Sequence, residues 1–265
     1  MKPLTIIVCI KNVPDPEGPS SAFEIHSDTK KVVPVGIAPV INPYDENALE
    51  VAVSLKDSWG GRVIALNMTE KAVTPILKKA LSVGADELII LEEPAFKDLT
   101  SSSKAKVLSA AIRKIGSYDL ILTGRQATDW DFGQVGLLIA EILKIPAVNL
   151  AQAVQLQEDG ILVEKLRKVG YEKVMVTIPA LITVSNEVGD LRLPTLKAIQ
   201  DARKKPVTLW RSVDLGIEPG ALKMTKIRSL TTPPSRSRTC FFIDGESPQE
   251  KGMNLALRLR QDRVL

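Results

Sequence analysis

The segment of this sequence best suited to chemistry is a polar loop that contains glycine and leads into a helical pattern. Residues 124–136 read GRQATDWDFGQVG, and an apolar helical pattern follows them without a break. The first backbone N–H groups of a helix have no partner inside the helix, and they favour anions. A phosphate could therefore be bound by the N–H groups of Phe132, Gly133, Gln134 and Val135.

The same loop also has a purely structural interpretation. Asp131 is a good N-cap residue, and Gly133 and Gly136 could serve only the close packing of helix on sheet. Asp129 and Asp131 would repel a phosphate unless they cap backbone donors or bond to ribose hydroxyls. The sequence contains neither the Rossmann glycine pattern after its first strand nor a Walker A loop. Spacing alone leaves both interpretations open.

Alternating strands and helices must position this loop. Residues 4–10 (LTIIVCI) form a continuous apolar run, which is typical of a strand buried on both faces of a parallel sheet. A helical pattern follows, and the alternation then continues, with helices expected at residues 45–56, 72–81, 103–115 and 135–143 and strands at 62–67, 87–91 and 120–123. Four such units in series favour a doubly wound α/β fold, in which ligands bind at the carboxyl ends of the strands.

The pattern changes after Pro146. Two apolar segments around the turn at residues 158–160 predict an added β-hairpin, and further strand material follows at residues 174–178 and 180–184. A helix is expected at 195–205. Beyond Pro206 the periodicity fades, apart from an apolar run at 240–243 and a last helix near 250–260. We therefore expect an α/β domain over residues 1–205 and an extended C-terminal arm over residues 206–265 that packs on something else.

Composition excludes several classes of protein. The net charge is only +4 over 265 residues, which is too mild to indicate nucleic-acid binding. No apolar run approaches the length of a membrane span, and the start of the chain lacks a signal-peptide pattern. Cys9 and Cys240 are the only cysteines, and His26 is the only histidine. We expect a protein of the reducing cytoplasm with no metal site and no catalytic acid or base, whose chemistry a cofactor carries.

Five segments, in order, resemble the β subunit of electron transfer flavoproteins. They are VCIKNVPDP (8–16), INPYDENALEVAVSLK (41–56), GADELIIL (84–91), DLILTGRQATDWDFGQVG (119–136) and LPTLKAIQDARKKP (193–206). The resemblance implies a heterodimer with an α subunit, on which the C-terminal arm would pack. It also implies a redox FAD shared with the α subunit, and an adenine nucleotide, either AMP or a second FAD, in the β subunit.

The resemblance further implies where this nucleotide lies. The residues expected to bind it are Cys9, Asn42, Met68, Gly124, Arg125, Gln126, Ala127, Thr128, Asp129, Asp131, Phe132, Gly133, Gln134 and Val135. Trp130 and Phe132 are bulkier than the residues that the family usually places in this loop. They could reshape the nucleotide pocket.

The function implied by the resemblance is electron transfer through FAD between a flavin-dependent dehydrogenase, expected to act on an acyl-CoA, and another redox protein. An alternative within the family is electron bifurcation, with NADH as donor and a second FAD in the β subunit. The segments 11–15 (KNVPD) and 129–135 resemble that branch. An alternative of another class is a stand-alone nucleotide-binding domain similar to universal stress proteins, although such a domain has no need of the arm after Pro206.

One loop is a candidate for partner docking. The family usually carries Asn-Glu-Pro-Arg there and inserts a leucine into the dehydrogenase, whereas residues 185–194 read SNEVGDLRLP with altered spacing. Leu191 or Leu193 is the expected anchor. The alternative is a leucine that packs beneath its own loop. Residues 167–173 (RKVGYEK) also depart from the family, which usually has an acidic run there.

Overall fold

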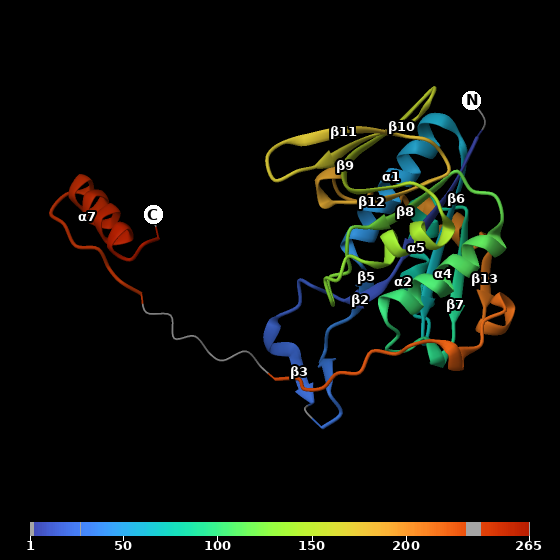
Figure 1. The fold of residues 1–265 in the computed structure, drawn as a ribbon, viewed down its shortest axis with the longest axis horizontal. Coiled ribbons are helices and arrows are strands. Elements are labelled where there is room, and N and C mark those ends of the chain that lie inside the picture. Colours follow the sequence, from blue (N-terminus) through green and yellow to red (C-terminus); the bar gives the residue numbers. More distant parts are fainter. Residues whose placement is uncertain (1–2, 27, 232–239, 265) are drawn as a thin grey trace. The chain divides into compact units, whose positions relative to one another are not determined.

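The computed structural model describes residues 3–26, 28–231 and 240–264. The chain forms two compact units, Met1–Ser229 and Leu230–Leu265 (Figure 1). The first unit contains a central β-sheet with helices on both faces. The second contains helix α7 (Pro248–Gln261).

The sheet has nine strands in the order β11-β10-β9-β12-β8-β1-β6-β7-β13. Their bounds along the chain are β1 Leu4–Ile10, β6 Gly61–Thr69, β7 Glu87–Glu92, β8 Leu120–Gly124, β9 Ala147–Gln157, β10 Gly160–Leu166, β11 Tyr171–Val176, β12 Ala180–Val184 and β13 Val207–Trp210. Neighbouring strands from β9 to β13 in this order are parallel, and β10 and β11 add an antiparallel edge. This confirms the predicted doubly wound, mostly parallel sheet with an added hairpin.

Strand β1 occupies the middle of this sheet. All its residues except Thr5 are buried, as expected of an apolar run covered on both faces. The chain moves from β1 to β6 and β7 on one side, and then returns across β1 to β8 and β12 on the other. The strand order therefore reverses between β1 and β8, which is where ligands bind in folds of this type.

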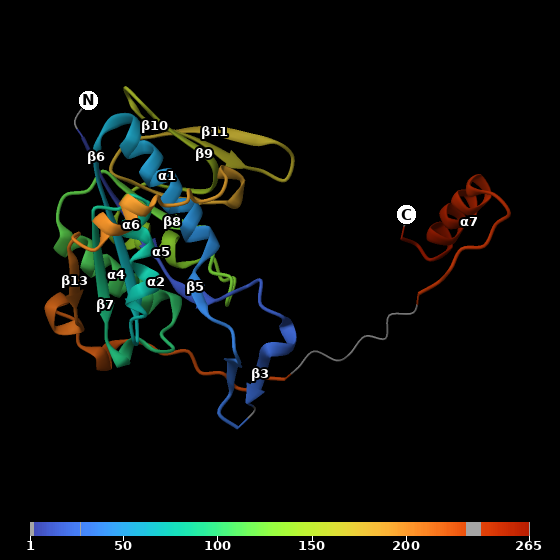
Figure 2. The same cartoon turned by 180° about the vertical axis from the view of Figure 1, so that it is seen from behind.

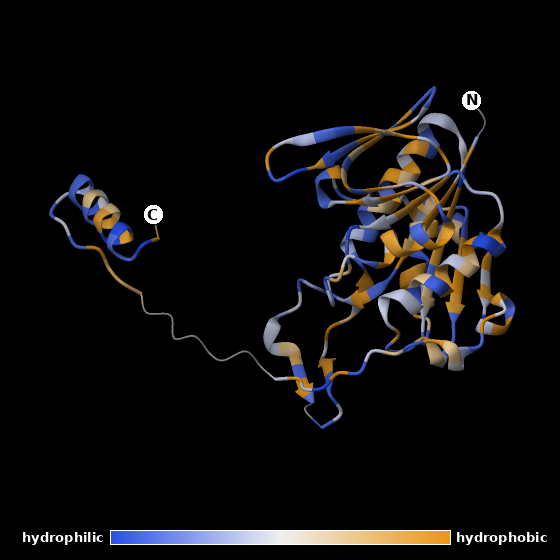
Figure 3. Ribbon diagram, viewed as in Figure 1, coloured by the Kyte–Doolittle hydropathy of each residue, from blue (hydrophilic) through white to orange (hydrophobic). Residues whose placement is uncertain are grey.

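Helices cover both faces of the sheet. One face carries α1 (Pro43–Trp59), α2 (Thr74–Leu77), α3 (Lys79–Val83) and α6 (Leu196–Ala202), and the other carries α4 (Ser101–Ile115) and α5 (Val135–Leu143). Figure 1 shows α4 and α5 in front of the sheet, and Figure 2 shows α1 and α6 from behind. The apolar residues concentrate in the strands and the inner sides of the helices (Figure 3). The helix expected at residues 72–81 is instead two short helices joined at Lys78.

Smaller elements lie in the connections. Two antiparallel pairs form between β2 (Asn12–Pro14) and β5 (Pro39–Ile41), and between β3 (Phe23–His26) and β4 (Lys31–Pro34). Short 3₁₀ helices occur at Ser20–Ala22, Pro94–Phe96, Asn186–Val188, Ser212–Leu215 and Pro219–Ala221. His26 is exposed in β3 beside Glu24.

The chain after Pro206 adds one more strand to the sheet. Strand β13 pairs in parallel with β7 from Val207 to Trp210, and Trp210 and Leu215 pack against the core on the α4 side. The compact unit consequently extends to Ser229, whereas the loss of periodicity suggested an arm that begins at Pro206. The four residues of β13 are too few for periodicity to reveal a strand.

The C-terminal unit contains the expected last helix. Ser247 caps α7 by accepting a hydrogen bond from the N–H of Glu250. The side chains of Met253, Leu255 and Leu257 are exposed on this helix, as are those of Phe241 and Phe242 before it. Within the described part of the chain, every helix is too short or too polar to span a bilayer.

Candidate functional site

The candidate site lies at the carboxyl ends of β1 and β8, where the strand order reverses. Here β1 leads into Lys11 and Asn12, and β8 leads through Gly124 into the loop 125–134 that precedes α5. The next strand, β6, ends at Thr69, so that Met68 faces the same edge. The topology therefore brings together the residues that the sequence placed at strand ends.

Asn42 holds the loop in place. It precedes the first residue of α1 and is completely buried, and it forms no side-chain cap on its own helix. Its side chain reaches across the switch point instead. The Nδ2 atom donates to the carbonyl of Gln126 at 2.8 Å, and the Oδ1 atom accepts from the N–H of Thr128 at 3.2 Å. One buried amide thus fixes two points of the loop.

Asp45 joins the two central strands, and the sequence analysis did not identify it. Its Oδ2 atom accepts from the N–H of Lys11 at 2.9 Å, and its Oδ1 atom accepts from the N–H of Gly124 at 3.0 Å. Burial raises the pKa of this carboxyl to about 7, although these hydrogen bonds and one from Asn42 act in the opposite direction. The sequence did contain one indication of this role: Asp45 is a carboxylate in the first turn of a helix that begins with an Asn-Pro step.

The loop approaches α5 through two residues with left-handed backbone. Asp131 has φ +53° and Gly133 has φ +58°. The suggestion that Asp131 caps α5 is wrong, because the N-cap position is Gln134, whose side chain forms no cap. Asp131 instead accepts a hydrogen bond from Gln126 Nε2 at 2.9 Å.

The backbone N–H groups at the start of α5 remain available to a ligand. Across the described residues, none of the four at positions 132–135 donates to another backbone or side-chain acceptor. Helix α5 begins at Val135 after the N-cap Gln134, so the N–H groups of these two residues lie at the positive end of its dipole, and those of residues 132 and 133 precede it. The arrangement agrees with an anion-binding role.

Charges of both signs surround the loop. Lys11 Nζ lies 2.5 Å from a carboxylate oxygen of Asp129. Lys104, in the first turn of α4, is half-buried, and burial together with the charge of Lys11 lowers its pKa. Arg125 donates to Ser185 Oγ at 3.0 Å and lies over the ring of Tyr44. Because Lys11 pairs with Asp129, the repulsion of a phosphate by this carboxylate is reduced, whereas the partner of Asp131 is the neutral amide of Gln126.

Two sulfur-containing side chains supply apolar surface. Cys9 is buried on the face of the sheet that α4 and α5 cover, and Met68 packs partly against the same cluster. Burial, and secondarily the charge of Asp45, raises the pKa of the Cys9 thiol to about 12. Cys9 is therefore a neutral thiol, suited to packing rather than to nucleophilic chemistry.

Several buried polar atoms at this edge lack partners within the described residues. They are both side-chain polar atoms of Asn12, Asn67 Oδ1, Thr128 Oγ1 and Arg125 Nε. Leaving a buried polar group unpaired costs about 1–3 kcal/mol. Such a cluster fits a polar ligand with both donors and acceptors, as a nucleotide has.

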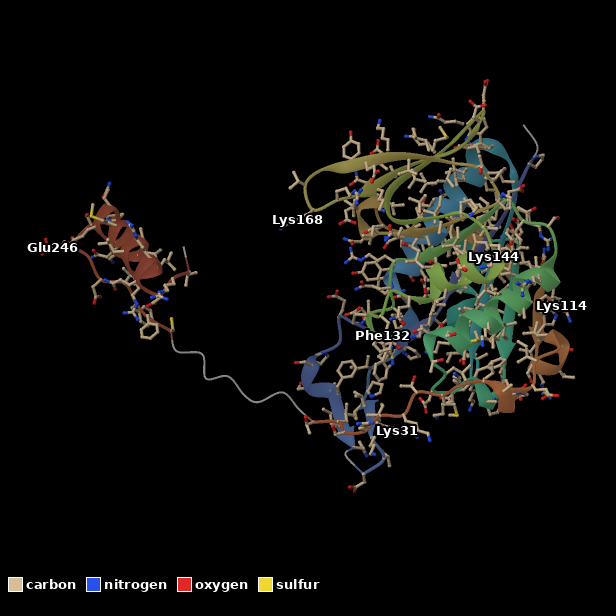
Figure 4. All side chains as sticks on the ribbon, viewed as in Figure 1. Lys31, Lys114, Phe132, Lys144, Lys168 and Glu246 are labelled. Atoms are coloured by element: carbon tan, nitrogen blue, oxygen red, sulfur yellow. The ribbon has the colours of Figure 1, made fainter. Side chains whose placement is uncertain are left out.

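Trp130 and Phe132 lie at the outside of the loop. Their side chains are exposed, and the two rings pair with centroids 5.8 Å apart. Phe132 is at the surface of the loop in Figure 4. In this structure the bulky pair adds an exposed aromatic surface to the loop before α5.

The docking candidates lie on the loop between β12 and α6. Leu191 is half-buried and packs against the core on the α1 side, whereas Leu193 is 90% exposed. The two leucines, both of which the sequence offered as the anchor, therefore differ in burial. No group of three or more His, Cys, Asp or Glu residues among those described is placed to hold a metal ion.

These features define a class: a doubly wound α/β domain with a polar loop and unpaired backbone N–H groups at the switch point of its sheet. Residues 29–215 match the family model described as the electron transfer flavoprotein domain. The chain belongs to the electron transfer flavoprotein family, and it is of the β-subunit type. It therefore functions in electron transfer, with an α subunit and a redox partner, and the stand-alone-domain alternative is excluded.

Similar proteins support this membership over the whole chain. The chain is 32% identical to the caffeyl-CoA reductase-Etf complex subunit CarD of Acetobacterium woodii, over 99% of this chain and 100% of the relative. It is 35% identical to an electron transfer flavoprotein subunit beta of Thermoanaerobacterium thermosaccharolyticum, with the same coverage. A subunit beta of Clostridium acetobutylicum is 34% identical over 86% of this chain and 88% of its own length.

Proposed function

We propose that this chain binds an adenine nucleotide, AMP or FAD, at the carboxyl ends of β1 and β8. Together with an α subunit it would pass electrons through a shared FAD between a flavin-dependent dehydrogenase, acting on an acyl-CoA, and another redox protein. The observation that carries the proposal is the loop 125–134, which Asn42 fixes and which presents free N–H groups at the start of α5.

The residues of this chain would bind and orient the nucleotide. The N–H groups of residues 132–135 would bind phosphate oxygens, with Lys11 and Arg125 as the nearest charged donors. Cys9 and Met68 would pack against the apolar parts of the ligand. When bound, FAD supplies the electron-carrying chemistry, and no side chain is proposed as a catalytic acid or base.

The test is to purify the αβ dimer, denature it, and separate the released nucleotides by chromatography. One FAD and one AMP per dimer would support the carrier with AMP in the β subunit. Two FAD molecules per dimer would support a second flavin in the β subunit. Release of a single FAD with no further adenine compound would refute nucleotide binding by this chain.

Electron bifurcation is the second candidate. It is favoured by the similarity to CarD, whose name places it in a caffeyl-CoA reductase–Etf complex, and by the segment 11–15. In this case NADH would supply the electrons and FAD would be the nucleotide bound at the carboxyl ends of β1 and β8. Reduction of two flavins per dimer by NADH under anaerobic conditions would support it, and an inert dimer under NADH would refute it.

Two further parts of the chain are proposed to bind partners. Leu193 is the candidate anchor for the dehydrogenase, because it is the leucine of the docking loop that is exposed. The C-terminal segment is proposed to pack on the α subunit, and its exposed apolar side chains support this.

In our proposal residues 1–205 contain the nucleotide-binding part of the chain. The protein is proposed to act in the cytoplasm, where an exposed thiol such as that of Cys240 stays reduced.

A further inference from the structure

Helix α1 carries a polar stripe that faces the docking loop. The stripe consists of Asn47, Glu50, Ser54 and Asp57, whose spacing of three or four residues places them on one side of the helix. Asn47 Nδ2 donates to the carbonyl of Gly189 at 2.6 Å, in the middle of the loop. The remaining three residues all contact Arg192.

Arg192 is bound to this stripe by its main chain and its side chain. Its backbone N–H donates to Glu50 Oε2 at 2.9 Å. Its Nε and Nη2 atoms form a fork on the same carboxylate, with Nε 3.0 Å from Oε2 and Nη2 2.7 Å from Oε1. The guanidinium also donates to Ser54 Oγ at 3.1 Å and to Asp57. A forked pair fixes geometry as well as charge, which a lysine could not do.

The charge of this cluster persists through neutral pH. Burial of Glu50 favours its neutral form, but the hydrogen bonds from Arg192 and Ser54 outweigh this and hold the pKa of Glu50 below its ordinary value. Glu50 also has a side chain that is only 19% exposed. The contact is therefore better shielded from water than a typical surface ion pair, which contributes little.

The two leucines beside Arg192 point in different directions. Leu191 packs against the core, and Leu193 remains 90% exposed, with Pro194 directly after it. Leu196 continues the exposed apolar surface into α6. A loop whose backbone is already held in the free protein loses less entropy when its exposed side chain enters a partner pocket. Holding Arg192 therefore determines how Leu193 is presented.

We propose that Arg192 is a positioning residue for partner docking: its contacts with Glu50, Ser54 and Asp57 hold the docking loop on α1 so that Leu193 projects in a fixed orientation. This inference rests on the proposed docking role of Leu193. It adds that the docking geometry is built by α1, a helix that lies outside the docking loop.

The first measurement is hydrogen exchange in the free αβ dimer. Arg192→Gln should lower the protection of the amides at residues 189–193 about tenfold, because the loop would open locally, and Arg192→Lys should give an intermediate loss. The matched control is Lys79→Gln. It removes the Lys79–Glu46 pair, which also involves α1 and has similar exposure but does not touch the loop. Equal protection in wild type and Arg192→Gln would overturn the proposal.

The second measurement is electron transfer from a short-chain acyl-CoA dehydrogenase reduced by its acyl-CoA substrate. Arg192→Gln should raise the KM for this donor about fivefold or more and leave kcat within about twofold, because the loop positions the anchor and does not carry electrons. Lys79→Gln should behave as wild type. A loosened loop with unchanged KM would overturn the docking role of Arg192.

Failure of the proposed function would look different. If Leu193→Ala leaves the KM unchanged, the docking surface itself is misassigned, whatever Arg192 does. If wild type accepts no electrons from this donor, the proposed partner class is wrong, and hydrogen exchange alone decides whether Arg192 holds the loop.

Discussion

Asp45 and Gly124 connect the two strands at which the sheet reverses its order. The Oδ1 atom of Asp45 accepts the N–H of Gly124 at 3.0 Å, while its other oxygen accepts the N–H of Lys11. The close approach leaves no room for a side chain at position 124, where a Cβ would lie 2.5 Å from Asp45 Oδ1. A glycine at the end of β8 is thus required by a buried carboxylate on helix α1.

Asp45 should make stability depend on pH. Its pKa rises from 3.8 to about 7 on folding, so the folded protein holds the proton more tightly than the unfolded chain. The resulting stabilisation is complete below about pH 4 and is lost as the pH rises to 7. In urea unfolding at pH 4.5 to 7.5, the advantage of wild type over Asp45→Asn should shrink with rising pH.

A suitable control for this measurement is Asp119→Asn. Asp119 accepts the N–H of Thr5 at 2.7 Å, so its replacement also removes a carboxylate bound to a strand, at the opposite end of β1. A difference between wild type and Asp45→Asn that grows with pH would contradict the assignment of a raised pKa to Asp45.

Gly133 allows a direct test of the anion site. Gly133→Asp should lower the amount of adenine nucleotide that copurifies with the αβ dimer, because a carboxylate would repel phosphate beside the start of α5. Gly133→Asn is the matched control, since it places nearly the same volume at the same left-handed φ of +58° without the charge. The measurement is nucleotide released per dimer. Equal losses in both variants would show that shape, not charge, is responsible.

The docking leucines should respond differently to truncation. Leu193→Ala should leave the melting temperature and flavin spectrum nearly unchanged and slow dehydrogenase-dependent flavin reduction about tenfold, which corresponds to about 1.4 kcal/mol of lost docking. Leu191→Ala should instead lower stability by about 1–3 kcal/mol, because Leu191 packs against the core. Thermal unfolding beside the reduction rate distinguishes them. A destabilised Leu193→Ala with normal transfer would place docking elsewhere.

The C-terminal unit should become resistant to protease only with its partner. Side chains including Phe242, Met253 and Leu257 are exposed on it, and burial against another chain would remove them from water. Limited proteolysis should cut residues 240–264 rapidly in the isolated β chain and slowly in the αβ dimer, with mass spectrometry to locate the cuts. Equal cleavage rates in the two samples would contradict packing on the α subunit.

Long elements of the fold were predictable because their periodicity is strong. Residues 4–10 and 135–143 form a strand and a helix with the expected bounds. Only the last part of strand β9 was predicted. Its first half pairs with β12 and its second half with β10, so the strand as a whole shows no single alternation of apolar and polar residues. The strand β13 was missed because its neighbour β7 lies more than a hundred residues earlier.

The site was predictable where backbone chemistry determines it. The loop before α5 could be recognised from its glycines and the helix that follows. Contacts between distant segments could not be recognised from the sequence. The clearest case is Asp45, which bonds to Lys11 and Gly124. The stripe on α1 that binds Arg192 is another, since it joins residues about 140 positions apart. Such pairs depend on the packing of α1 against the sheet, which local sequence does not specify.

The two cysteines differ so strongly in environment that they give the protein a built-in labelling position. Cys9 is buried, and its pKa of about 12 keeps it protonated, whereas Cys240 is exposed. A maleimide dye at neutral pH should therefore attach to Cys240 alone in the native protein. The dye would mark the C-terminal unit without any mutation, and its fluorescence anisotropy would follow assembly with the α subunit in real time.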